Sequence, residues 1–191
     1  MTIDTLDALE TRDPGQRERD LMARLPQLIA LAKRAPGWQR ILDGVDPASV
    51  DSRAALAALP ITRKADLKTL QKEPMPFGGL NTTPVSQMSR VFISPGPIFD
   101  PEGRGLDWWR FARPMYAGGV RNGGLLQNCL SYHFTPAAFM VEGGAARIGS
   151  AVIPAGAGQT EMQVQAMADL KPDTYVGTPS FLRIIIEKAR E

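Results

Sequence analysis

The feature that most constrains the fold of this chain is a regular alternation of apolar runs and helix-like segments over its last third. The apolar runs are residues 125–130, 150–156 and 174–180. The segments with helical spacing are residues 135–149, 159–171 and 180–191. The second is expected to turn Met162, Val164 or Gln165, and residues 166–170 inward. Strands that alternate with helices of about a dozen residues form right-handed units with parallel strands. The alternation therefore predicts a mostly parallel β/α sheet.

The first 72 residues predict a helical section instead. Leu21, Leu25 and Leu28 recur at helical spacing among charged residues, with a kink expected at Pro26. Another short helix is expected to begin with Thr62 as its N-cap. We therefore predict an α/β fold with two parts, a helical N-terminal section at 1–72 and a β/α portion at 73–191.

Composition excludes several functions. The 22 Lys and Arg residues nearly balance the 20 Asp and Glu residues, so neither nucleic acid nor a membrane surface is an expected partner. One cysteine, Cys129, and one histidine, His133, argue against a cysteine-rich zinc site and a histidine-based metal site. No apolar run approaches the ~20 residues of a membrane span, so a cytoplasmic location is expected. No metal ligand and no catalytic residue are predicted.

The stretch "RVFISPGPIFDPEGRG", residues 90–105, has the order of a phosphate-binding loop. An apolar run is followed by small residues, and a helix is expected over 106–119. A strand, a small-residue loop and a helix are the setting in which backbone amides bind phosphate. Pro95 and Pro97, however, have no amide hydrogen to donate. The stretch is therefore either a phosphate loop with altered chemistry or only a turn.

Three further loops follow the predicted strands, and their sequences are "NCLSYHF", "IPAGAGQT" and "VGTPS". In parallel sheets of this kind, ligands bind outside the carboxyl ends of the strands. We expect these loops to form a binding cleft. For the glycines of "IPAGAGQT", a turn that needs positive φ is an equally good interpretation. In "VGTPS", the main role expected of Thr178 or Ser180 is to cap the last helix, and a role in a pocket is secondary.

The segments "LPITRKADL", "GVRNGGLLQN", "SAVIPAGAGQTEMQVQAMADLKPD" and "VGTPSFL" resemble the N-terminal part of phenylacetate–coenzyme A ligases. The resemblance runs from about residue 16 to 191. It implies part of the large domain of an adenylate-forming enzyme, which activates an acid with ATP and then forms a thioester with coenzyme A. The complete enzyme would need ATP, Mg²⁺ and coenzyme A, and its substrate would be a small aromatic or apolar carboxylic acid.

The resemblance also implies that some machinery of such an enzyme lies outside these residues. The family's acidic phosphate and magnesium motif, of the type "YG-x-TE", does not occur in the 191 residues. The last helix also has three consecutive isoleucines, 184–186, which cannot all lie on one helix face. We expect a truncated enzyme that is inactive alone and needs the missing C-terminal part as its partner. Whether it forms a homodimer is left open.

Site residues are carried over from the resemblance position by position. The loop at 94–97 aligns with the family's phosphate loop, so the cofactor candidates are Ser94, Gly96 and Arg104, the nearest cation. Pro95, Pro97, Ile98 and Phe99 replace the hydroxyl-rich centre of the family's loop. The substrate candidates on the strand ends are Tyr132, His133, Phe134, Ala155, Gly156, Thr178 and Pro179. The aromatic position of Tyr132 helps to line the acid pocket in the family.

The altered loop keeps a second function open. A non-catalytic or degenerate member of the family would retain the fold and bind a small acid, a thioester or a protein partner. An unrelated flavodoxin-like binding domain is a third alternative, which the helical first ~70 residues disfavour because such folds usually begin with a strand.

Overall fold

The computed structural model describes residues 4–191, which form two compact units. The helical unit is Ala8–Gly103, and the sheet unit joins the segment ending at Asp7 to Arg104–Glu191. Each unit is described by itself below. The domain boundary placed between residues 72 and 73 stays a prediction.

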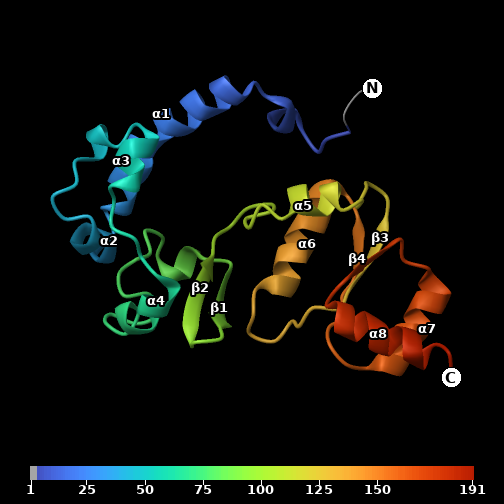
Figure 1. The fold of residues 1–191 in the computed structure, drawn as a ribbon. Coiled ribbons are helices and arrows are strands. Elements are labelled where there is room, and N and C mark those ends of the chain that lie inside the picture. Colours follow the sequence, from blue (N-terminus) through green and yellow to red (C-terminus); the bar gives the residue numbers. More distant parts are fainter. Residues whose placement is uncertain (1–3) are drawn as a thin grey trace. The chain divides into compact units, whose positions relative to one another are not determined.

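The first α-helix of the helical unit is α1 (Pro14–Ala32), and three short helices follow it (Figure 1). These are α2 (Pro36–Ile41), α3 (Arg53–Ala57) and α4 (Lys64–Leu70). Turns of 3-10 helix lie at Ala8–Thr11, Pro47–Ser49 and Val85–Gln87. The Asp13 carboxylate caps α1 by accepting a hydrogen bond from the backbone N–H of Gln16 at 2.7 Å. Ile29, Leu42 and Val50 form the small buried core of this unit.

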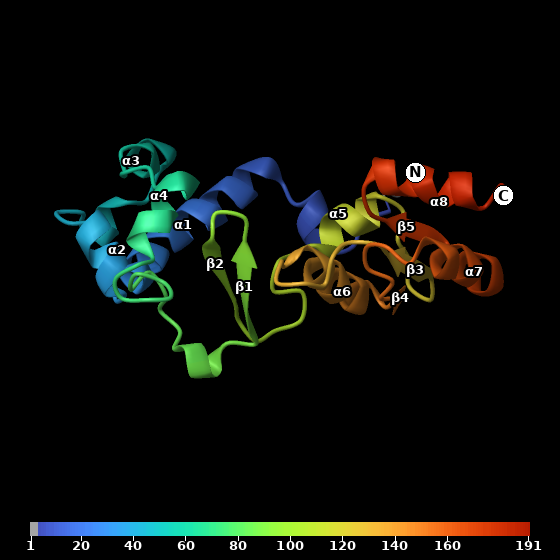
Figure 2. The ribbon, with the colours of Figure 1, turned by 90° about the horizontal axis from the view of Figure 1, so that it is seen from below.

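A β-hairpin completes the helical unit, and it corrects the prediction of a helix after the loop at 94–97. Strand β1 (Arg90–Ser94) pairs antiparallel with β2 (Ile98–Glu102), with Ser94 opposite Ile98 (Figure 2). The second strand was not predicted, because Pro97 and Pro101 are residues typical of turns. A two-stranded ribbon tolerates Pro101 because each strand has a free edge that needs no amide hydrogen.

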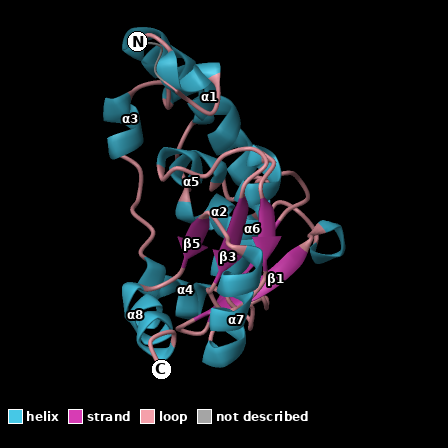
Figure 3. Ribbon diagram, turned by 90° about the vertical axis from the view of Figure 1, so that its right-hand side faces the viewer, coloured by secondary structure: helices cyan, strands magenta, loops and turns pink. Residues whose placement is uncertain are grey.

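The sheet unit contains the predicted parallel sheet. Its strands are β3 (Leu125–Asn128), β4 (Ala151–Ile153) and β5 (Thr174–Val176), in the order β4-β3-β5. Figure 3 shows β5 beside the central strand β3. Both pairings with the central strand β3 are parallel, which confirms the predicted mostly parallel β/α sheet. The unit's helices are α5 (Ala112–Ala117), α6 (Ala137–Ile148), α7 (Thr160–Leu170) and α8 (Pro179–Lys188).

The two faces of this sheet are covered differently. Leu126, in the middle of β3, is fully buried in one core with Met115 of α5 and Val141 of α6. Its neighbour Gln127 points to the opposite face, because successive side chains of a strand alternate, and it meets Gln163 of α7 there. One face is therefore apolar, whereas the other carries a buried polar cluster.

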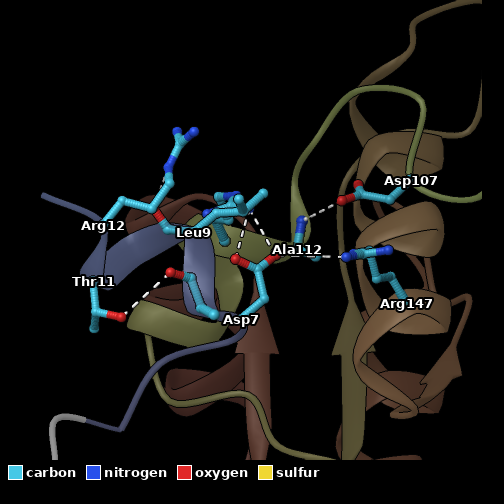
Figure 4. Close-up of polar contacts among 9 residues, drawn as sticks. Asp7, Leu9, Thr11, Arg12, Asp107, Ala112 and Arg147 are labelled. Carbon is cyan, nitrogen blue, oxygen red and sulfur yellow. Dashed lines mark hydrogen bonds and ion pairs between the residues drawn. The ribbon is translucent and has the colours of Figure 1, made fainter. Parts of the chain in front are cut away.

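The helix predicted over 106–119 is wrong in extent, because α5 covers only Ala112–Ala117. The side chain of Asp107 accepts hydrogen bonds from the backbone N–H groups of Phe111 and Ala112, at 2.6 and 3.2 Å. Asp107 and Arg110 both have positive φ, which breaks helical geometry before α5. Figure 4 shows Asp107 directed at Ala112, and Asp7 paired with Arg147 beside it at 3.6 Å.

Candidate functional site

The carboxyl ends of the three parallel strands meet at one edge of the sheet unit. The backbone carbonyl of Asn128, the last residue of β3, accepts a hydrogen bond from the N–H of Gly156 after β4, at 2.9 Å. The N–H of Cys129 donates to the carbonyl of Val176, the last residue of β5, at 2.7 Å. The loops singled out from the sequence are thus fastened together at the place where parallel sheets bind ligands.

A polar chain at this edge holds Tyr132 in place. Asn128 is fully buried, and its side-chain amide donates to the hydroxyl of Tyr132 at 2.9 Å and to the carbonyl of Ala138 at 3.0 Å. The Tyr132 hydroxyl in turn donates to the carboxylate of Glu142 at 2.6 Å. The ring of Tyr132 also packs edge-on against Phe139, with ring centroids 5.4 Å apart. Tyr132 is therefore a fixed aromatic wall rather than a mobile side chain.

Two members of this chain, Asn128 and Glu142, are absent from the candidates derived from sequence. Asn128 follows Gln127 at the end of β3, and these two polar residues in a short strand that begins with two leucines were the available signal. Glu142 lies on α6, and a single carboxylate on a helix ordinarily faces solvent. It is half-buried and bonded to Tyr132 instead.

Burial raises the pKa of the Tyr132 hydroxyl well above its ordinary range, and the nearby Glu142 carboxylate raises it further. Burial also raises the pKa of the Cys129 thiol. Both groups are therefore neutral at physiological pH. The edge of the sheet can donate and accept hydrogen bonds, but these two groups provide neither a general base nor a thiolate nucleophile.

This shift predicts a loss of stability in alkali. Free tyrosine ionises near a pKa of about 10, so above that pH the unfolded chain releases a proton that folded Tyr132 retains. The stability that Tyr132 contributes is thus complete below pH ~10 and falls as the pH rises toward the raised pKa of the folded state. Urea unfolding between pH 8 and 11 should show a shallower alkaline decline for Tyr132→Phe than for wild type. Equal declines would contradict the assignment.

The glycine loop after β4 is held from behind by Gln163 of α7. The Gln163 amide nitrogen donates to the carbonyls of Gly156 and Gly158, both at 2.8 Å. Its carbonyl oxygen accepts from the amide of Gln127 and the thiol of Cys129, both at 2.9 Å. Gln163 is only 3% exposed, so it acts as the hub of a buried polar cluster. The Oε1 atom of Gln127 has no hydrogen-bond partner among residues 4–191.

Gly156 and Tyr132 are the two predicted substrate residues that the structure brings together. A Cβ atom added to Gly156 would lie 3.8 Å from the Tyr132 ring, and Gly156 has a φ of 68°. The predicted positive-φ turn is therefore present, beside the aromatic wall. Ala155 precedes this contact and is half-buried. A role of these residues in binding substrate stays a prediction.

The other substrate candidates are more exposed. His133 is exposed, and the Phe134 side chain is 74% exposed. The Thr178 hydroxyl accepts from the N–H of Phe181 at 3.3 Å, which confirms the predicted cap of the last helix, and Pro179 is the first residue of α8. Their proposed contacts with substrate also stay predictions.

The cofactor candidates divide between the units. Ser94 ends strand β1 and Gly96 lies in the turn of the same hairpin in the helical unit, whereas Arg104 is in the sheet unit. The Ser94 hydroxyl donates to the carboxylate of Asp100 on the paired strand, so it is already engaged. Together with the two prolines, this leaves the turn few donors for phosphate. Nucleotide binding at these residues remains a prediction.

Two features of other functional classes are not found in residues 4–191. No helix in this range is long and apolar enough to cross a membrane. The same residues bring together no group of three or more His, Cys, Asp or Glu side chains that could hold a metal ion.

Comparison with curated proteins finds phenylacetate–coenzyme A ligases. Identity is 33% with the enzyme of Thermus thermophilus, 31% with that of Aromatoleum evansii and 29% with that of Escherichia coli. These alignments cover 93%, 94% and 98% of this chain. The chain spans only 41% to 44% of the length of these relatives. No family model matches the chain.

Comparison with solved structures finds 2-hydroxyisobutyryl-CoA ligase. The structure in the postadenylation state with 2-HIB-AMP superposes with a TM-score of 0.85 at 28% identity, over 93% of this chain and 40% of that one. A second structure, with 2-HIB-AMP and CoA in the thioesterification state, gives a TM-score of 0.85 at 27% identity, over 94% of this chain and 41% of that one.

Proposed function

This chain belongs to the phenylacetate–coenzyme A ligase family of adenylate-forming enzymes, and from that premise we propose that it is part of an ATP-dependent acid–coenzyme A ligase. The reaction would join a carboxylate to AMP with release of pyrophosphate, and then transfer the acyl group to the thiol of coenzyme A. The likeness to ligases solved with an acyl-AMP conjugate and CoA supports this proposal. The enzyme would act in the cytoplasm.

The observation that carries the proposal is the rigid wall at the carboxyl edge of the sheet. Tyr132 is fixed by Asn128 and Glu142, and the backbone at Gly156 lies beside its ring. A neutral aromatic surface next to a glycine backbone suits the apolar body of an acid. We propose that Tyr132 and Gly156 form one wall of the pocket for an aromatic or apolar acid.

The remaining chemistry would come from the rest of the enzyme. Residues 4–191 gather no set of side chains fit for Mg²⁺, and the hairpin turn at 94–97 offers few amide donors to a triphosphate. We therefore propose that these residues alone do not form an adenylate. ATP, Mg²⁺ and coenzyme A would be bound with the C-terminal part of the ligase.

The test is a titration of the ¹⁵N-labelled chain with a stable acyl-adenylate mimic, phenylacetyl sulfamoyl adenosine. Amide signals of residues 132, 155–156 and 178 should shift, and Tyr132→Ala should weaken the response. Tyr116→Ala is the matched control, because the Tyr116 hydroxyl bonds Asp4 away from the strand ends. The isolated chain should not exchange pyrophosphate into ATP. Absence of shifts at the strand ends, or exchange by the chain alone, would refute the corresponding part.

The engaged Ser94 and the prolines of the turn favour a second candidate, a non-catalytic member that binds an acid without a nucleotide. The same titration with phenylacetate and with AMP separately distinguishes the two. Shifts with phenylacetate, and none with AMP or the mimic's adenosine portion, would support the second candidate.

A further inference from the structure

The helical unit contains a pocket whose lining shares Gly96 with the candidate phosphate loop but is otherwise built from residues that the proposed ligase function does not use. Its volume is about 560 Å³, within the range of small-molecule sites. It lies between the end of α4 and the hairpin, and its lining includes Lys68, Lys72, Met75, Gly96, Pro97 and Phe99. All of these residues belong to one compact unit.

The hairpin wall of the pocket is held rigidly. Gln71, just after α4, is only 7% exposed, and its side-chain amide donates to the carbonyl of Phe99 at 2.8 Å. Its amide oxygen accepts from the N–H of Phe99, also at 2.8 Å. This pair of bonds fastens the outer edge of β2 to the helix end. The ring of Phe99 therefore presents an apolar surface that needs little ordering when a ligand binds.

The apolar part of the lining extends beyond Phe99. Met75 is 62% exposed, which is costly for a large apolar side chain that nothing covers. Pro97 adds a further apolar surface without an amide donor. Met75 and Pro97 flank Phe99 in the lining, so an apolar group entering the pocket would cover all three.

The charged part of the lining is of one sign. Lys68 and Lys72 are four residues apart at the end of α4, and both are exposed. Neither ammonium group has an ion-pair or hydrogen-bond partner among the described residues, and no acidic side chain lines the pocket. Two unpaired cations beside an apolar surface favour a ligand with an anionic group and an apolar part. The anionic group would lie at the lysines, and the apolar part would contact the pocket lining.

We propose that this pocket binds a small organic anion, with an apolar aliphatic or aromatic body on Phe99, Met75 and Pro97 and a carboxylate or phosphate group at Lys68 and Lys72. Its lining shares no residue with the acid pocket proposed at Tyr132, and the proposal does not depend on ligase activity. Because the hairpin turn holds Gly96 and Pro97, the ligand would also hold that turn in place.

The experiment is a titration of the ¹⁵N-labelled chain with octanoate, octyl phosphate and the neutral octanol. Both anions should shift amides at residues 68–75 and 96–99, and octanol should bind more weakly. Exposed charge pairs contribute up to ~1 kcal/mol, so Lys68→Gln and Lys72→Gln should each weaken anion binding about threefold, and the double variant about tenfold. Lys64→Gln is the matched control, on the same helix but outside the lining, and should leave binding unchanged.

Each outcome bears on the proposal. Equal binding of octanol and the anions, or no effect of the double lysine variant, would overturn it. Anion shifts confined to residues 128–134 and 154–158 would also overturn it, and would instead support the acid pocket. If octanoate binds at α4 while phenylacetyl sulfamoyl adenosine shifts nothing, the ligase proposal fails and this one stands. A preference for octyl phosphate over octanoate would identify the head group as phosphate.

Discussion

Replacing Leu126 with alanine should lower the free energy of unfolding of the sheet unit by about 3 kcal/mol, within the range known for large-to-small changes in cores. Leu126 is fully buried in the centre of β3, between side chains of α5 and α6. Alanine would remove apolar contacts from both helices and leave a cavity that a strand paired on both sides cannot close. Urea unfolding, followed by hydrogen exchange of the β3 amides, measures the loss.

Leu170→Ala provides the matched control for Leu126→Ala. Leu170 ends α7 in the same unit, and it is 55% exposed. The same chemical change should therefore alter the unfolding free energy by no more than ~0.5 kcal/mol. A loss at Leu126 no greater than the loss at Leu170 would show that α5 and α6 do not pack on the sheet as described.

Replacing Gln163 with leucine should lower the free energy of unfolding of the sheet unit by about 3 kcal/mol, although the new side chain is apolar and of similar size. Leucine would leave the carbonyls of Gly156 and Gly158 without donors in a buried setting. It would also remove the acceptor for the amide of Gln127, whose own Oε1 already has no partner among residues 4–191. The desolvation of these groups, each costing about 1–3 kcal/mol, outweighs the gain from burying leucine.

Hydrogen exchange gives this second prediction a local measurement. In Gln163→Leu, the amides of residues 156–159 should exchange faster than the amides of β3, because the loop is released before the sheet. Gln165→Leu is the control on the same helix, since Gln165 is exposed and bonds only Asp169 among the contacts described. Uniform acceleration across the sheet unit would mean that Gln163 supports the whole unit rather than the loop.

The parallel sheet could be predicted because its signals are local. Alternating apolar runs and helical spacing identify the strands, and Thr178 caps α8 as predicted because a threonine before proline suits the first turn of a helix. The resemblance of the chain to the ligase family indicated where the candidate site lies. The sequence near Asp107, however, did not indicate that its carboxylate accepts hydrogen bonds from the N–H groups of Phe111 and Ala112. The later start of α5 was therefore not predicted.

The orientation of α7 could not be predicted in the same way. Helical spacing placed Met162 and Leu170 inward at the two ends of the helix, but Met162 is 68% exposed and Leu170 is 55% exposed, so the prediction is wrong at both ends. Val164 and Met167 between them are half-buried. Gln163 takes the inward position instead, because the glycine loop presents carbonyls that only a donor can satisfy. The need for this donor arises from a loop conformation with positive φ, which hydrophobic periodicity does not report.

The division of the chain into units has a consequence for its synthesis. The segment ending at Asp7 belongs with residues 104–191, and Asp7 pairs with Arg113 and Arg147 there. Residues 8–103 are thus inserted within the other unit. Domains form as units while the chain leaves the ribosome, so the inserted unit can form as soon as it has emerged. The ion pairs of Asp7 can form only after Arg113 and Arg147 have emerged, and the sheet can be completed only later, when β5 pairs with β3.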